Sequence, residues 1–365
     1  MWKIISKDIN KNIQKFESVE YGTLVAPICI GNGRYIIESI LSNEGGFGVI
    51  YNAKDTRLAN RRVLIKANKY EDFIFNKYEN DIDGLKKEIN KIRNNTKREF
   101  ETLVYLKRNE EARMPSVNDI IYDFCPIMYR QNVLGPEMYN QEPYIVMQMI
   151  NGENLGDYVT NQTKEEILKR RGYKDLREWE LDILSYSLQI ATILEGFHQR
   201  KKLDEARSIY RIYQDLKPQN IMLTDERFIT MLDFGGITTV VEYEDGYTET
   251  SDELGNPGLG TDGYRAPEFS TDEYRVDERV DIYSLGATMY HLLTGIPLNR
   301  IIESEYDRIP IDNLRKYYNK VTCEIVEKCT HLDREKRYRN IHEVKEAIKA
   351  AFKPVRTGSK ALEVI

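Results

Sequence analysis

Four polar residues in one stretch of the chain have the types and the spacing needed to transfer a phosphoryl group. Asp215, Lys217 and Asn220 fall within a single loop, and Asp233 follows 13 residues after Asn220. A carboxylate such as Asp215 can accept the proton of an attacking hydroxyl, and the Lys217 ammonium can neutralise a phosphoryl group in transfer. Asn220 and Asp233 offer hard oxygen ligands of the kind that Mg²⁺ prefers. The alternative interpretation is a polar surface turn without catalytic function.

The apolar residues around these positions predict the elements that hold them. One apolar run, residues 221–223, directly follows the loop, and a second run covers residues 228–232. Two such runs joined by a polar turn are typical of a β-hairpin. The hairpin returns Asp233 to the neighbourhood of Asp215.

The pattern D-x-K-P-x-N followed by D-F-G resembles the catalytic loop and the metal-binding loop of eukaryotic-type protein kinases. Further on, Ala-Pro-Glu at 266–268 resembles the signature that closes the substrate-docking loop of this family. Thr261 lies where the family places a hydroxyl that bonds the catalytic Asp and Lys. The resemblance also implies that Arg337 is the buried partner of Glu268, and that Asp281 braces the backbone of the catalytic loop.

A glycine cluster precedes these motifs and lies between strand-like runs. Glycines allow tight turns and close approach of backbone amides to a phosphate. With Val-Leu-Ile-Lys at 63–66 behind it, the cluster resembles the kinase glycine-rich loop and its third-strand lysine, Lys66. The resemblance implies a carboxylate partner for Lys66, and Glu99 in the helical pattern 98–106 has the matching spacing, in preference to Glu101. Asn43 replaces the first glycine of the family pattern.

The nucleotide contacts are also implied by the resemblance. The apolar run 144–150 resembles the hinge of the family, with Met147 as the gatekeeper and the backbone of Gln148 and Ile150 bonding the adenine edge. Leu64 and Ile50 are expected to form the roof over adenine, and both are bulkier than the family norm. The full set of expected nucleotide-binding residues is Asn43, Gly45, Gly46, Phe47, Gly48, Ile50, Leu64, Lys66, Met147, Gln148, Ile150, Asn154 and Met222.

The order of these motifs predicts an α+β bilobal kinase-like fold. We expect a small β-rich N-lobe at about 33–148 and a larger helical C-lobe at about 151–352. Residues 1–32 are expected to form an extension that packs on the small lobe, and 353–365 a tail. The charged ranges 70–95, with a helix across 85–93, and 161–178 are interpreted as insertions. The range 236–265 is polar and acidic and carries few strand or helix signals.

Composition narrows the setting of the protein. The 365 residues are 41% hydrophobic and 31% charged, with a net charge of −6, so we expect no direct binding of nucleic acid and no attraction to an anionic membrane. The four cysteines, Cys29, Cys125, Cys323 and Cys329, lack metal-ligand spacing and suit free thiols in a reducing cytoplasm. The sequence shows neither a signal peptide nor an apolar run of about 18 residues.

The resemblance implies an enzyme that uses ATP and Mg²⁺ to phosphorylate Ser or Thr hydroxyls of a protein or peptide. Lys217, two positions after Asp215, resembles the Ser/Thr rather than the Tyr kinases. Two other functions are weighed: a small-molecule kinase of the aminoglycoside-phosphotransferase type, which usually lacks the Ala-Pro-Glu loop, and a pseudokinase scaffold, which the retained Lys66, Asp215, Asn220 and Asp233 disfavour.

One departure concerns control. Many protein kinases carry an Arg immediately before the catalytic Asp, where it binds a phosphate on the activation segment. The residue here is Gln214, which cannot pair with a phosphate as Arg does. The expected activation segment is already acidic, with Glu242, Glu244, Asp245, Glu249, Asp252 and Glu253. We therefore expect basal activity without phosphorylation of this segment.

Overall fold

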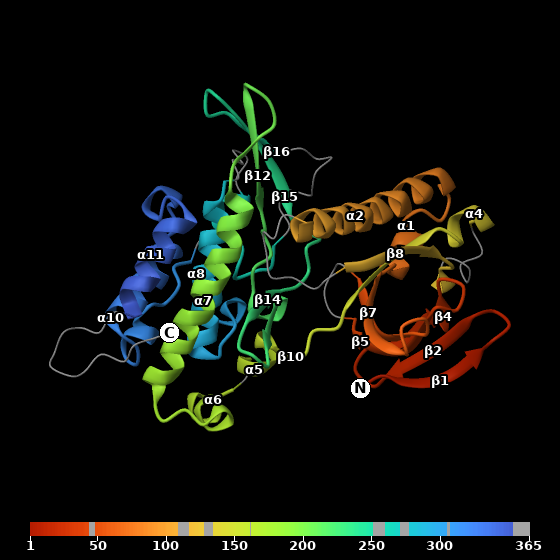
Figure 1. Ribbon diagram of the computed structural model, residues 1–365, viewed down its shortest axis with the longest axis horizontal. Helices are drawn as coiled ribbons and strands as arrows, with labels where there is room; N and C mark the ends of the chain where they lie inside the picture. Colours follow the sequence, from red (N-terminus) through yellow and green to blue (C-terminus); the bar gives the residue numbers. More distant parts are fainter. Residues whose placement is uncertain are drawn as a thin grey trace. The chain divides into compact units, whose positions relative to one another are not determined.

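The computed structural model describes residues 1–43, 48–108, 117–127, 134–160, 162–250, 260–270, 277–304 and 307–352. They belong to two units, an N-terminal one that ends at Ile150 and a C-terminal one that begins at Asn151. The N-terminal unit is rich in β-structure and the C-terminal unit is mainly helical (Figure 1). The predicted α+β fold class is confirmed.

Two antiparallel sheets make up most of the N-terminal unit, with strand orders β1-β2-β3 and β4-β5-β6-β7-β9-β8. Side chains alternate between the two faces of a strand, so Val49, Tyr51 and Ala53 of β6 all face the core. Phe16 and Ala26 of the first sheet belong to the same core, so the N-terminal extension packs on the second sheet. The strand bounds are β1 Lys3–Asp8, β2 Ile13–Ser18, β3 Gly22–Pro27, β4 Cys29–Ile30, β5 Tyr35–Ser42, β6 Val49–Asp55, β7 Arg61–Ala67, β8 Val117–Asp123 and β9 Glu142–Gln148.

One long helix, α2 (Ile82–Arg108), dominates the helical part of the N-terminal unit, alongside the short helices α1 (Asp72–Lys77) and α4 (Pro136–Tyr139). The helical segments predicted at 85–93 and 98–106 are confirmed, and both are parts of this one continuous helix. Its buried positions Leu103 and Leu106 hold it on the sheet.

A buried polar network fixes α2 where the low helix propensity of residues 94–96 would favour a break. Glu142, 1% exposed, accepts hydrogen bonds from Asn68 Nδ2 at 2.8 Å, from Tyr70 Oη at 2.9 Å and from Arg93 Nε at 2.9 Å. Thr96 Oγ1 donates to Asn68 Oδ1 at 2.5 Å. Because Arg93 and Thr96 lie on α2 while the other residues lie on or beside the sheet, the network ties the helix to the sheet within one turn of Glu99.

The C-terminal unit is built around α8 (Arg279–Thr294), which is buried over almost all of its length. Helices α7 and α10 pack against it, and α11 packs on α7 (Figure 1). The remaining bounds are α5 Leu155–Val159, α6 Lys164–Arg171, α7 Leu176–His198, α9 Asp312–Arg315, α10 Lys320–Cys329 and α11 Ile341–Phe352, with short 3₁₀ turns at Pro218–Asn220, Pro267–Ser270, Leu298–Arg300 and Arg334–Lys336.

Two small sheets complete the C-terminal unit. The first has the order β10-β13-β14, with β10 Gly152–Asn154, β13 Ile221–Thr224 and β14 Ile229–Met231, and contains the predicted hairpin. The second has the order β11-β12-β15-β16, with β11 Lys201–Lys202, β12 Arg207–Ile212, β15 Thr238–Tyr243 and β16 Thr248–Thr250. In Figure 1 the strands β12, β15 and β16 extend beyond the helices of their unit.

This second sheet corrects the prediction for residues 236–265. That range was expected to carry few strand signals, yet β15 forms six antiparallel pairs with β12 and continues into the hairpin with β16. Residues 238–241, Thr-Thr-Val-Val, are all β-branched and suit a strand. The prediction gave more weight to the acidic residues of the range than to the strand preference of these four residues.

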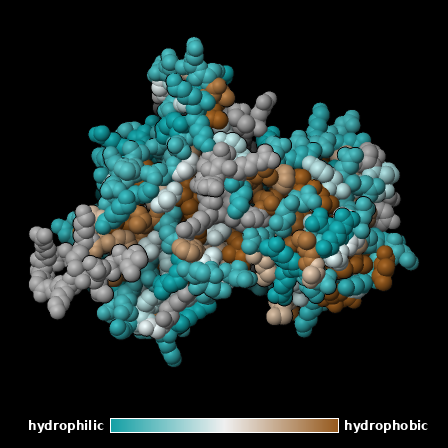
Figure 2. All heavy atoms as spheres, viewed as in Figure 1, coloured by the Kyte–Doolittle hydropathy of each residue, from teal (hydrophilic) through white to brown (hydrophobic). Residues whose placement is uncertain are grey.

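The surface and the cysteines agree with the composition. Figure 2 shows a mainly hydrophilic face with scattered apolar patches on both units. Among the described residues, the helices lack the combination of length and apolarity that a membrane span requires. All four cysteines are free.

The buried network makes a prediction about stability. Arg93→Met leaves the Glu142 carboxylate buried without its cation, and removing one partner of a buried pair costs about 3–5 kcal/mol. We expect the urea midpoint of unfolding to fall accordingly. Lys91→Met, an exposed substitution of the same type on the same helix, serves as the control and should change it little. Equal midpoints for the two variants would show that the network does not hold α2.

Candidate active site

Lys66 and Glu99 meet on one side of the N-terminal sheet. The ammonium of Lys66, on β7, lies 2.7 and 2.8 Å from the two carboxylate oxygens of Glu99 on α2. Both side chains are buried, at 7% and 6% exposed. Glu101, the alternative considered from the sequence, is exposed instead. The pair presents one fixed cation whose position is set by the helix.

The residues expected above adenine share the sheet face of Lys66. In the β6–β7 ladder Ile50 is paired with Lys66, and in the β7–β9 ladder Leu64 is paired with Met147. Directly paired residues point to the same face, and Leu64 and Lys66 are two apart on one strand. The core-facing residues of these strands point the opposite way. Ile50, Leu64, Lys66 and Met147 therefore form one continuous surface away from the core.

The glycine cluster is described only at its ends. Gly48 has a φ of +152°, and a Cβ there would lie 2.4 Å from the carbonyl oxygen of Ala67, so only glycine fits. The backbone carbonyl oxygen of Asn43 accepts a hydrogen bond from the Lys69 ammonium at 3.4 Å. Gly45, Gly46 and Phe47 lie outside the described residues. Gln148 ends β9, and Ile150 follows two residues later.

In the C-terminal unit, Asp215 is the centre of a compact polar cluster. It is 4% exposed and accepts hydrogen bonds from Thr261 Oγ1 at 2.7 Å and from Asn220 Nδ2 at 2.8 Å. The ammonium of Lys217 lies 3.0 Å from the Asp215 carboxylate and donates to Thr261 Oγ1 at 2.6 Å. A carboxylate, an ammonium and a hydroxyl thus lie within direct contact of one another.

The backbone of this loop is held by a buried carboxylate on α8. Asp281, which is fully buried, accepts hydrogen bonds from the backbone N–H groups of Tyr213 and Gln214 at 2.8 Å each. His198 Nε2, at the end of α7, lies 2.8 Å from the same carboxylate. His198, the last residue of α7, is thus the third group that holds Asp281. The resulting backbone is unusual, with φ of +69° at Gln214.

The β13–β14 hairpin places Asp233 beside the loop. The backbone N–H of Leu232 donates to the carbonyl of Asn220 at 2.8 Å, so the residue before Asp233 is bonded to the loop directly. Asp233 has a φ of +52°, a left-handed conformation that Asp adopts more readily than most residues. Among the described residues, His, Cys, Asp and Glu form no cluster of three or more that suits a metal. A Mg²⁺ ion held by Asn220 and Asp233 would thus take its remaining oxygens from phosphates and water.

Asn154 and Met222 face each other across the β10–β13 pair. The Asn154 side chain caps α5 by accepting from the N–H groups of Gly156 at 2.8 Å and Asp157 at 3.4 Å. Its Nδ2 donates to the carbonyl of Gln219 at 2.6 Å. These bonds tie α5 to the loop, so a ribose contact from Asn154 would compete with its cap.

The segment after residue 260 is anchored to the helical core at two points. Glu268 forms a two-pronged ion pair with Arg337 at 2.7 and 2.8 Å, and the Arg337 side chain is fully buried. Tyr264 Oη lies 2.6 Å from His291 Nδ1 on α8. Burial lowers the pKa of His291 to about 4, so its imidazole stays neutral at physiological pH and this contact carries no net charge.

One contact of the site was not foreseen from the sequence. Gln214 Nε2 donates to the hydroxyl of Thr238, the first residue of β15, and both side chains are buried. The sequence offered one indication of it, because Gln214 stands where many kinases have Arg. A buried neutral amide needs a hydrogen-bond partner, and a neutral hydroxyl can serve as one. This bond connects the loop to the sheet that follows the Asp-Phe-Gly motif.

Comparison with known proteins agrees with this geometry. Residues 44–352 match the protein kinase domain family. The chain is 27% identical over 322 residues to a protein of Clostridium acetobutylicum named probable serine/threonine-protein kinase, covering 86% of this chain and 39% of that protein. It is 26% identical to the serine/threonine-protein kinase Nek10 of Mus musculus, covering 63% of this chain and 19% of that one.

A third relative is the serine/threonine-protein kinase PknB of Mycolicibacterium smegmatis, with 32% identity over 155 residues, 42% of this chain and 20% of that protein. The chain therefore spans about two fifths of the Clostridium protein and smaller parts of the other two. Because the family match covers most of the chain and includes both clusters described above, this chain belongs to the protein kinase family.

Proposed function

We propose that the chain catalyses ATP- and Mg²⁺-dependent phosphoryl transfer to Ser or Thr hydroxyls of a protein or peptide. The observation that carries the proposal is the cluster of Asp215, Lys217, Asn220 and Thr261, which brings a base, a cation and a metal ligand together on a braced loop. The names of the bacterial and mammalian relatives support Ser/Thr as the acceptor class.

Each residue has a role that follows from its contacts. Asp215 orients the acceptor hydroxyl and accepts its proton, because its carboxylate is fixed by three donors and cannot turn away. Lys217 neutralises charge on the transferring group, and Thr261 holds Asp215 and Lys217 at a constant separation. Lys66, oriented by Glu99, binds the α- and β-phosphates. Leu64, Ile50 and Met147 contact the adenine.

The donor set fits a magnesium ion. Asn220 bonds Asp215 through its amide nitrogen, so these bonds do not use its amide oxygen, and Asp233 supplies a carboxylate at the end of the hairpin. Mg²⁺ bound there neutralises phosphate charge. Asn220 and Asp233 therefore act by holding this charge next to the Asp215 loop.

The two alternatives are not favoured. The Glu268–Arg337 pair anchors a docking loop for a polypeptide substrate, which a small-molecule phosphotransferase does not need. A pseudokinase scaffold has no use for the contacts among Asp215, Lys217 and Thr261. The four free cysteines support a reducing cytoplasmic setting.

The first test addresses the base. Asp215→Asn keeps the size of the side chain but removes the proton acceptor, so we expect transfer to a generic protein acceptor to fall by about 10²–10⁴-fold while nucleotide binding persists. Asp225→Asn, in the exposed turn of the adjacent hairpin, is the matched control and should keep full activity. Near-normal turnover in Asp215→Asn would remove the assigned role.

A second test addresses the metal. Binding of a ligand to the folded state raises the melting temperature, so ATP should stabilise the parent protein more strongly with Mg²⁺ than without it. Asp233→Ala should abolish this Mg²⁺ dependence, and Asp225→Ala should retain it. If the Mg²⁺ response of Asp233→Ala equals that of the parent, Asp233 is not a ligand.

A third test concerns the segment after Asp-Phe-Gly. The β12–β15 ladder, the Gln214–Thr238 bond and the Arg200–Glu242 ion pair of 3.1 Å order residues 238–243 without any phosphate. We expect the combined replacement of Thr239, Thr248, Thr250 and Ser251 by Ala to keep activity within about tenfold of the parent, since no activating phosphate is needed.

Phosphatase-treated parent protein is assayed alongside and should show the same activity. Thr238 and Thr261 stay intact because their hydroxyls are structural. A hundredfold loss in both samples would contradict the expectation.

A further inference from the structure

Arg200 lies at the base of the β11–β12 hairpin, two residues after α7 ends at His198. From there the chain runs out along the hairpin and returns through β12 to Tyr213, which begins the loop that carries Asp215. In Figure 1, β12 extends beyond the helices of its unit. A rotation of the hairpin about its base would therefore move the start of this loop.

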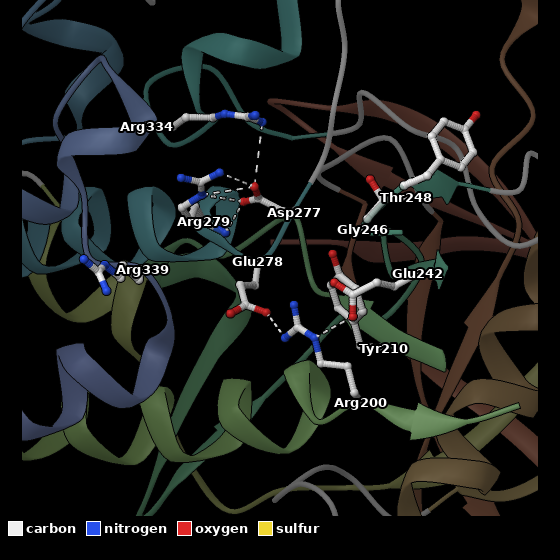
Figure 3. A pocket seen from close by; sticks show the side chains of 11 residues that line it. Arg200, Tyr210, Glu242, Gly246, Thr248, Asp277, Glu278, Arg279, Arg334 and Arg339 are labelled. Carbon is white, nitrogen blue, oxygen red and sulfur yellow. Dashed lines mark hydrogen bonds and ion pairs between the residues drawn. The ribbon is translucent and has the colours of Figure 1, made fainter. Parts of the chain in front are cut away.

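The guanidinium of Arg200 contacts groups from four segments of the chain. Its Nη1 donates to the backbone carbonyl of His198 at 3.2 Å and to the Glu278 carboxylate, and its Nε donates to Glu242 at 3.1 Å. It also lies 4.2 Å from the centroid of the Tyr210 ring. Figure 3 shows the guanidinium between Glu278 on one side and Glu242 and Tyr210 on the other. One side chain thus joins the end of α7, the start of α8, β12 and β15.

Two of these contacts lead to Asp281, the carboxylate that holds the backbone of the Asp215 loop. Glu278 directly precedes α8, and its backbone carbonyl accepts the N–H of Asp281 at 3.2 Å. His198, whose carbonyl Arg200 binds, contacts the Asp281 carboxylate through Nε2 at 2.8 Å. Arg200 therefore holds two groups that flank this carboxylate.

The pair with Glu278 is the stronger of the two ion pairs of Arg200. The Glu278 side chain is 8% exposed, and the Glu242 side chain is 28% exposed. Surface pairs contribute little because water and salt screen them, whereas removing one partner of a buried pair leaves a charge uncompensated. The contact with the start of α8 therefore has the larger effect on the structure around Asp281.

We propose that Arg200 is a positioning residue for phosphoryl transfer, because it holds the two groups that flank Asp281. A displaced Asp281 would release the loop backbone and misplace the Asp215 carboxylate relative to the acceptor hydroxyl. The inference rests on the proposed kinase function. Arg suits this role because a planar guanidinium presents its donors in a fixed fork and binds several acceptors at once. A lysine ammonium in its place would balance the charge but would not fix these acceptors in the same directions.

Steady-state kinetics with a generic protein acceptor test the role. In Arg200→Gln we expect kcat to fall by about 10–100-fold, because a small misplacement of a reacting group costs this much. The KM for ATP should stay that of the parent, since the nucleotide contacts lie elsewhere. Arg200→Lys keeps the charge, so it should retain the urea midpoint of the parent and still lose kcat. Arg207→Gln, which removes an exposed arginine of β12 that pairs with Asp204, is the matched control and should keep full kcat.

Hydrogen exchange detects the same coupling without catalysis. The backbone N–H groups of Tyr213 and Gln214 donate to Asp281 at 2.8 Å each, so their exchange rates report on these bonds. We expect both amides to exchange faster in Arg200→Gln and in Glu278→Gln, with the amides of α10 unchanged. The double variant should lose no more kcat than Arg200→Gln alone, since both substitutions break the same contact.

Parent-like kcat and amide exchange in Arg200→Gln would overturn the proposal. Full recovery of both in Arg200→Lys would also overturn it, because charge balance alone would then suffice. A raised KM for ATP together with faster exchange throughout the C-terminal unit would indicate general loss of structure and count against a positioning role. A parent protein that transfers no phosphoryl group would instead contradict the proposed function, and the exchange rates would still test the coupling from Arg200 to the loop.

Discussion

The buried carboxylate of Asp281 is the constraint on which the catalytic cluster depends. An ionised carboxylate without solvent exposure is stable only when donors satisfy it, and three of them come from different places: the backbone of Tyr213 and Gln214, and His198. The end of α7, the loop and the start of α8 must therefore meet at one point. These bonds maintain the strained φ of Gln214, and this backbone conformation sets the direction in which the Asp215 side chain points.

The N-terminal unit also contains a buried carboxylate, Glu142, that donors from separate segments hold in place. Glu142 is buried and accepts hydrogen bonds from Asn68 and Tyr70, which follow β7, and from Arg93 on α2, so the helix cannot shift without leaving a buried charge unpaired. Glu99 lies one turn beyond Thr96 on that helix. The Lys66–Glu99 pair thus rests on a network that is remote from it in sequence, and a buried charge gives the helix a specific register that apolar packing alone leaves less defined.

The sequence predicted what depends on short spacing. Asp215, Asn220 and Asp233 are linked by one hairpin, and an alternating strand pattern places Leu64 and Lys66 on one face, so local rules suffice for both. Among contacts between distant segments, it predicted those that the family resemblance implies, such as Glu268–Arg337 and Lys66–Glu99, and missed the others. Gln214 bonds Thr238 only because β15 pairs with β12, and α2 runs unbroken only because Arg93 and Thr96 have tertiary partners. Asn154 shows a third case, in which a local capping rule describes the side chain better than the family pattern does.

Many protein kinases have an Arg where this chain has Gln214, and this difference is linked to the pairing of β15 with β12 after Asp-Phe-Gly. Position 214 is 1% exposed, and a charged side chain there would need an anion to balance it. A neutral amide needs only the Thr238 hydroxyl, which the β12–β15 ladder delivers to a fixed place. The cation near this segment is instead Arg200, whose side chain is 39% exposed, so its charge costs less desolvation free energy than a charge at position 214 would. Because Arg200 joins Glu242 of β15 to Glu278 before α8, carboxylates of the chain itself tie this segment to the helical core.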